Sequence, residues 1–261
     1  MYGKGLRPLS IATVVMWAIT LSLVFFYAPI EADQGFLQKI FYLHVPLAII
    51  ALCGYVIGGI FAILHLRKDD PRWDAYSYVS IHISVIFTVG GLLTGAIWAK
   101  GSWGHWWVWN EPTLVSFLIV FLLYATYYPF RYAIEDRQRQ ARYASVFAIT
   151  AGAFVPLNFL AVRASASLVH PRVFATAEGG LPTSMLVTFL FALVSMGLLW
   201  ATLVKFELSS KSAQGQLKRL RRALDAPAGP PSSRKVCSAP LPGFSSSSSG
   251  ISLRYLSSPG M

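Results

Sequence analysis

The sequence has little charge and almost no cysteine, and each shortage excludes a class of protein. Only 13% of its 261 residues are charged, roughly half of what a soluble domain carries, whereas 55% are hydrophobic. The two cysteines are Cys53, inside an apolar run, and Cys237, near the C-terminal end. They cannot meet in an oxidising compartment, so we expect no disulfide and no soluble, disulfide-stabilised domain.

The usual motifs of enzymes and metal sites are also missing. No cysteine cluster or external run of Asp and Glu completes a zinc or calcium site. No Ser-His-Asp set and no phosphate-binding glycine loop is evident. The net charge of +11 comes from basic residues that have no folded domain of their own. Imidazole and a wide aromatic surface are the chemistry that remains, and the basic residues give no reason to expect a nucleic-acid-binding protein.

Long apolar runs are abundant. A bilayer core about 30 Å thick requires about 20 apolar residues per spanning helix. Six such runs are present, at 9–30, 40–64, 76–98, 112–130, 143–162 and 182–206. The first follows two basic residues, as in a signal peptide, but it is long and lacks a convincing cleavage site, so we expect it to be retained. The predicted fold class is an all-α polytopic membrane protein with six transmembrane helices.

The basic residues predict the orientation of these helices. All but four of the 22 Lys and Arg residues fall on the side that holds both termini. The other side holds only Lys39, Lys100, Arg163 and Arg172. The positive-inside bias then predicts cytoplasmic termini and an external loop between the third and fourth helices.

The composition changes near residue 206. We expect residues 1–206 to form the six-helix membrane domain and residues 207–261 to form a cytoplasmic tail. Residues 211–225 are basic and suit a short surface helix against anionic lipid. Residues 226–261 are rich in Pro, Gly and Ser, a composition typical of disorder.

The external loop between the third and fourth helices is rich in tryptophan. It holds four of the eight tryptophans within seven residues: Trp103, Trp106, Trp107 and Trp109. The spacing of the first three predicts a helical turn that shares one face at the membrane surface. Asn110, Glu111 and Pro112 predict the start of the next helix, with Asn as its cap. Interfacial tryptophans are also ordinary membrane anchors, so a ligand surface and an aromatic belt both remain open.

Histidines add chemistry to this aromatic surface. Three of them, His44, His105 and His170, fall on the predicted external side. Two imidazoles can occupy the axial positions of haem iron, and indole rings can stack on a porphyrin. External arginines such as Arg163 or Arg172 could pair with propionates. A haem-like ligand and a structural role for the histidines are both compatible with the residues.

Helix packing is predicted by small residues in the second and third runs. Gly54, Gly58 and Gly59 lie in the second run, and Gly90, Gly91 and Gly95 lie in the third. His82, also in the third run, is the one ionisable side chain well inside a span. It suits either a ligand or relay, or an imidazole that is hydrogen-bonded to a neighbouring helix, which we favour.

A known family has the same motif. The segment Trp103-Gly104-His105-Trp106-Trp107-Val108-Trp109-Asn110 resembles the W-G-x-x-W-x-W-D signature of the tryptophan-rich haem-handling proteins of cytochrome c maturation. Residues 1–206 resemble haem exporter protein C in size and topology. That family has one haem-ligating histidine in a Y-x-H-V-P segment, which here is Tyr42-Leu43-His44-Val45-Pro46. Its second ligand lies in the last external loop, where His170 is the only histidine.

The resemblance implies a function and a set of site residues. His44 and His170 would be the axial ligands of a non-covalent haem b, which agrees with the lack of a C-x-x-C-H segment for covalent attachment. The motif residues would complete the binding surface: Trp103, Gly104, Trp106, Trp107, Trp109 and Asn110. The implied partners are a membrane-tethered haem chaperone and ATP-binding-cassette components, in a bacterial cytoplasmic membrane.

One departure from the family concerns a carboxylate. The family's acidic residue stands here as Asn110, which keeps the capping ability but loses the charge. Glu111, one residue later, is a candidate substitute for that carboxylate, although on a helix its side chain would point in another direction.

Two other functions remain as alternatives. A b-type electron-transfer cytochrome would need histidine pairs within the bilayer, and His82 has no deep partner. A permease subunit would be expected to have broken helices or buried charges, for which Pro156 and the glycines are the only hints.

Overall fold

The computed structural model describes residues 3–32, 34–165, 169–170 and 181–225, and within them the regular elements are helices. A π-helical turn, Leu23–Tyr27, continues the first helix, and a 3-10 segment, Phe36–Ile40, leads into the second. The helices α1 to α6 are Leu6–Ser22, Phe41–Lys68, Pro71–Trp103, Pro112–Tyr132, Arg137–Ala164 and Thr183–Asp225. Among the described residues, six helices are long and apolar enough to cross a membrane, which confirms the predicted all-α, six-span class.

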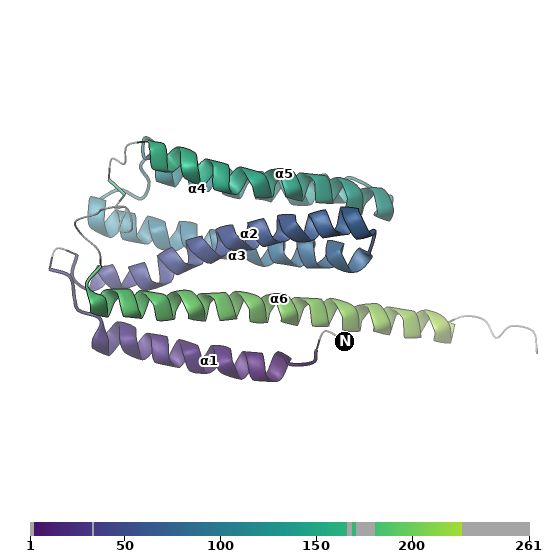
Figure 1. Cartoon of the computed structure of the whole chain (residues 1–261), viewed down its shortest axis with the longest axis horizontal. Helices are drawn as coiled ribbons and strands as arrows, with labels where there is room; N and C mark the ends of the chain where they lie inside the picture. Colours follow the sequence, from purple (N-terminus) through teal and green to yellow (C-terminus); the bar gives the residue numbers. More distant parts are fainter. Residues whose placement is uncertain (1–2, 33, 166–168, 171–180, 226–261) are drawn as a thin grey trace, which may run out of the picture. The chain divides into compact units, whose positions relative to one another are not determined.

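Helix α2 is the central packing element of the bundle within Met1–Arg219. In Figure 1, α2 and α3 lie between the α4–α5 pair and the α6–α1 pair. Residues of α2 belong to each of three buried apolar clusters. One joins α2 to α4 and α5 around the stacked rings of Tyr55 and Tyr124, whose centroids are 3.6 Å apart. The second joins α2 to α3 and α6 around Ala51 and Met196, and the third joins it to α6 around Tyr42.

The small residues of α2 allow these close contacts, as predicted. A Cβ atom on Gly59 would lie 3.2 Å from the carbonyl oxygen of Ala148, and one on Gly152 would lie 3.4 Å from the Cα atom of Gly59. The faces of the helices that point away from the bundle carry large apolar side chains. Val14, Leu93 and Leu157, for example, are all more than 60% exposed. Such faces suit contact with lipid chains.

Helix α1 is held to α6 by hydroxyl pairs. Thr20 and Ser195 are both buried and their hydroxyl oxygens are 2.7 Å apart. About two helical turns closer to the N-terminus of α1, the hydroxyl oxygens of Thr13 and Thr202 are 2.8 Å apart. Hydrogen bonds of this kind between membrane helices contribute about 0.6 kcal/mol on average.

Replacing Ser195 by alanine is expected to loosen this contact. The substitution leaves the Thr20 hydroxyl without its inter-helix partner and should lower the unfolding free energy by about 0.5–1.5 kcal/mol. Thermal unfolding of the detergent-solubilised protein measures the effect. Ser22→Ala is the matched control, because the exposed Ser22 hydroxyl bonds only to Ala18 of its own helix. Equal melting temperatures for the two variants would contradict the assignment.

The end of the bundle away from the tryptophan loop is fixed by ion pairs. Arg131 of α4 donates to both carboxylate oxygens of Asp74 of α3, at 2.8 and 2.6 Å. Asp70 caps α3, and its hydrogen bonds from Arg72 hold the pKa of the Asp70 carboxyl below its usual value. The Arg131–Asp74 ion pair joins α4 to α3, whereas the Asp70–Arg72 contact is local to the start of α3.

Helix α6 crosses the boundary that the composition predicts at residue 206. Residues 211–225 are helical, as predicted, but they continue α6 and do not form a separate helix. The chain divides into two units, Met1–Arg219 and Leu220–Met261. The predicted disorder of residues 226–261 concerns a segment outside the described residues.

Candidate functional site

The tryptophan motif is not a continuous helical turn. Helix α3 ends at Trp103, and Gly104 caps it in the left-handed conformation, with a φ of 77°. Residues 104–111 then form a non-helical connection to α4. The predicted turn over Trp103, Trp106 and Trp107 is therefore wrong, because the φ that Gly104 adopts ends the helix.

These three tryptophans nevertheless meet at one place. Their side chains line a cavity of about 260 Å³ between α2, α3, α4 and α5. Apolar side chains form most of its wall, as is usual for small-molecule and cofactor sites. Trp109 is 74% exposed and contacts the edge of Trp107, with ring centroids 5.9 Å apart.

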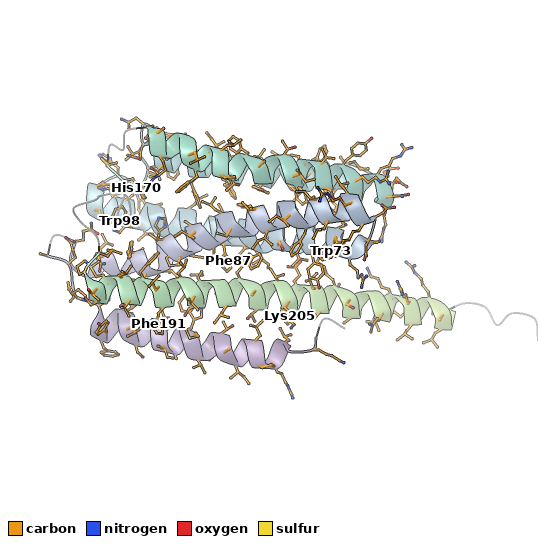
Figure 2. The ribbon with its side chains drawn as sticks, viewed as in Figure 1. Trp73, Phe87, Trp98, His170, Phe191 and Lys205 are labelled. Atoms are coloured by element: carbon orange, nitrogen blue, oxygen red, sulfur yellow. The ribbon has the colours of Figure 1, made fainter. Side chains whose placement is uncertain are left out.

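The two predicted ligand histidines line the same cavity although they are far apart in the sequence. His44 comes from the first turn of α2, and His170 comes from the segment between α5 and α6. The imidazole of His170 packs edge-on against Trp98 and Trp103, with centroid distances of 6.3 Å to each. Figure 2 shows His170 and Trp98 together at one end of the bundle and Trp73 at the other.

The hydrogen bonding of His44 determines which ring nitrogen can bind a metal. Its Nδ1 lies 3.0 Å from the carbonyl oxygen of Gly91 on α3. A carbonyl oxygen only accepts, so Nδ1 carries the proton and donates, and the lone pair is left on Nε2. This arrangement orients many metal-binding histidines in proteins. The backbone of α3 thereby fixes both the tautomer and the ring orientation of His44.

Polar atoms at the cavity suit acidic groups on a ligand. The indole N–H of Trp107 and the hydroxyl of Thr113 line the cavity, are buried, and have no hydrogen-bond partner among the described residues. Arg163 also lines it, with its guanidinium 5.8 Å from the ring centroid of Phe159. Arg172, the other predicted propionate partner, lies outside the described residues.

The other predicted residues lie away from the cavity. His105 and Asn110 are exposed and are not part of its lining. The predicted cap of α4 is also wrong, because Glu111 and not Asn110 occupies the N-cap position. Pro112 begins the helix, as predicted. Glu111 precedes the first residue of α4. Its side chain therefore does not point where a position within the helix would place it.

Two further residues join the site: Trp98, which sequence reasoning missed, and Glu111, which it expected to point in another direction. Trp98 contacts His170 and donates from its indole nitrogen to the side-chain oxygen of Gln34, at 3.0 Å. The Glu111 carboxylate accepts from the backbone N–H of Val169 and His170. Trp98 lies inside an apolar run, where nothing in the sequence separates it from a packing residue.

His82 lies in the other half of α3. Its Nδ1 is 3.0 Å from the hydroxyl of Tyr128 on α4, which confirms the predicted hydrogen bond to a neighbouring helix. Its Nε2 is 4.0 Å from the Glu207 carboxylate of α6. His82 therefore contacts a tyrosine and a glutamate, and no second histidine faces it within the described residues.

Comparison with known proteins agrees with the motif. Residues 1–223 match the family described as heme exporter protein C, CcmC. The chain belongs to this family. Heme exporter protein C of Rhodobacter capsulatus is 32% identical over 156 residues, which are 60% of this chain and 64% of that protein. The match therefore spans slightly less than two thirds of the Rhodobacter protein.

Other relatives match over longer segments. Heme exporter protein C of Bradyrhizobium diazoefficiens is 31% identical over 77% of this chain and 76% of its own length. A putative cytochrome c biosynthesis ccmC-like mitochondrial protein of Marchantia polymorpha is 29% identical over 65% of this chain and 72% of its own. All the described helices of this CcmC family member begin within the matched residues 1–223.

Proposed function

We propose that this protein binds haem at the external face of the bacterial cytoplasmic membrane and passes it to a membrane-tethered haem chaperone. One observation carries the proposal: His44, His170 and three tryptophans of the motif line a single apolar cavity. The names of the relatives, heme exporter and cytochrome c biosynthesis protein, are consistent with this cargo. The bias of Lys and Arg toward the opposite end supports an external site.

The two imidazoles give the cavity its chemistry toward iron. His44 offers Nε2 from a helix, and His170 offers an imidazole from a loop, so the two approach from different elements. Together they can fill both axial positions of a non-covalent haem b. Trp103, Trp106 and Trp107 supply aromatic surface for the porphyrin, and Arg163, which lines the same cavity, supplies a cation for a propionate.

Ligation by two imidazoles favours binding and delivery of haem over catalysis by it. With both axial positions filled, the iron has no open position for oxygen chemistry. Release to a chaperone then requires one imidazole to leave. ATP-binding-cassette components of the same maturation system are the further partners in this proposal. Nothing in this role requires the chain to be an enzyme.

The absorption spectrum of the purified protein tests the proposal. Protein from haem-sufficient cells is expected to show a six-coordinate, low-spin, bis-imidazole haem. His170→Ala should convert it to a high-spin species or remove the haem, because one axial ligand is lost. His82→Ala is the matched control, since His82 bonds to Tyr128 away from the cavity, and it should leave the spectrum unchanged. A wild-type spectrum in His170→Ala would refute the axial assignment.

A further inference from the structure

Glu111 is a carboxylate in a place where carboxylates are costly. It is 0% exposed, at the start of a membrane helix beside the cavity. A buried carboxylate is tolerated only where hydrogen bonds replace its water. Here the backbone supplies them: Oε1 accepts from the N–H of Thr113 at 3.4 Å. Oε2 accepts from the N–H groups of Val169 at 2.9 Å and His170 at 3.2 Å.

The two oxygens therefore connect the start of α4 to the backbone of His170, which is 59 residues after Glu111 in the sequence. One oxygen caps α4, whose position is fixed by packing against α5. The other holds the backbone of His170 itself, next to the cavity. Hydrogen bonds to an ionised acceptor are shorter and about twice as strong as neutral ones. The shorter, 2.9 Å bond is on the loop side and not on the cap side.

We propose that Glu111 is the positioning residue that holds His170 at the cavity for iron ligation. The inference rests on the proposed function, in which His170 is an axial ligand. The ring of His170 is steadied by Trp98 and Trp103, and its backbone by Glu111. A ligand on a loop gains a defined position only when both its ring and its backbone are held.

The competing explanation is that Glu111 only caps α4. The two roles use different carboxylate oxygens, so variants that affect one side more than the other distinguish them. Glu111→Asp keeps a carboxylate at the N-cap, where Asp is favoured, but withdraws it by one methylene from Val169 and His170. Glu111→Gln keeps the length, but its amide offers one acceptor and one donor group, so it cannot serve both sides. Positioning predicts that both variants disturb His170. Capping alone predicts that Glu111→Asp behaves as the wild type.

Hydrogen exchange of the haem-free protein is the first measurement. Loss of two charge-assisted hydrogen bonds is expected to speed exchange at the Val169 and His170 amides by about tenfold or more in both variants. Glu135→Gln is the matched control, because Glu135 is an exposed carboxylate beyond the other end of α4. It should leave these amides unchanged. The melting temperature of each variant reports any loss of the helix cap.

The haem spectrum and midpoint potential are the second measurement. Glu111→Asp and Glu111→Gln should show a reduced low-spin fraction and a shifted potential at equal haem content, while Glu135→Gln matches the wild type. Faster exchange with an unchanged spectrum and potential would overturn the inference, as would unchanged exchange. A wild-type protein without bis-imidazole haem would instead overturn the proposed function, and the amide exchange would still decide whether Glu111 holds the loop.

Discussion

Replacing His44 by alanine is expected to remove low-spin haem from the purified protein. The imidazole is held by the hydrogen bond from Nδ1 to the carbonyl of Gly91, so Nε2 has one orientation. Loss of partners in a second shell already costs roughly 10–100-fold in metal affinity, and loss of the ligand itself should cost at least that much. We therefore expect the affinity for haem to fall by about 100-fold. Any haem that remains bound should be high-spin.

Free imidazole distinguishes loss of the ligand from loss of the fold. Deleting the side chain leaves a space of imidazole size in the cavity wall, so millimolar imidazole should restore a low-spin spectrum to His44→Ala. A misfolded protein would not recover in this way. His82→Ala, which removes an imidazole from the same bundle outside the cavity, should keep the wild-type spectrum throughout. Low-spin haem in His44→Ala without added imidazole would disprove the assignment of this ligand.

The spanning helices could be predicted from the sequence because the bilayer imposes a length. Each long apolar run coincides with a helix, yet the helices extend beyond the runs. The run 76–98 lies within Pro71–Trp103, and α6, Thr183–Asp225, continues well past the end of the run 182–206. Hydropathy measures the segment that sits in hydrocarbon, whereas the backbone hydrogen bonds of a helix continue into charged residues outside it. The boundaries therefore depend on caps such as Asp70 and not on hydropathy.

The site could be predicted only in part. His44 and the tryptophans stood out by residue type and external position, and the resemblance to the family then assigned them to one site. Trp98 did not stand out, since an aromatic residue in an apolar run carries no separate signal. Glu111 was placed on the helix and assumed to point elsewhere, but it is the N-cap, and its partners come from a loop 58 and 59 residues later. No local spacing rule predicts a contact of that separation.

Gly95 of α3 explains how the ring of His44 can occupy its place. A Cβ atom added at Gly95 would lie 2.7 Å from Cε1 of His44 and 3.3 Å from its Nδ1. Cε1 stands between the two ring nitrogens, so displacing it moves both of them. The hydrogen bond to Gly91 and the direction of Nε2 would change together. Gly95 thus has a specific function here, beyond the close helix packing that its residue type predicts.

Gly95→Ala is therefore expected to impair haem ligation without unfolding the protein. Alanine gains about 1 kcal/mol of helix propensity over glycine, while overpacking against the imidazole costs about 1–3 kcal/mol. The net loss of stability should be small, at most about 2 kcal/mol. The low-spin haem fraction should fall much further, because ligation depends on the orientation of one ring. Absorption spectra and melting curves of the same preparations separate the two effects.

Gly90→Ala is the matched control on the same helix. Its added Cβ would lie 3.4 Å from Cδ1 of Leu47, an ordinary contact with the end of a flexible side chain. This variant should keep the low-spin spectrum and gain up to about 1 kcal/mol from helix propensity. Identical spectra for Gly95→Ala and Gly90→Ala would show that the ring of His44 has room to move without cost. In that case the close approach of Gly95 would not determine the direction of Nε2, and the hydrogen bond to Gly91 alone would hold the ring.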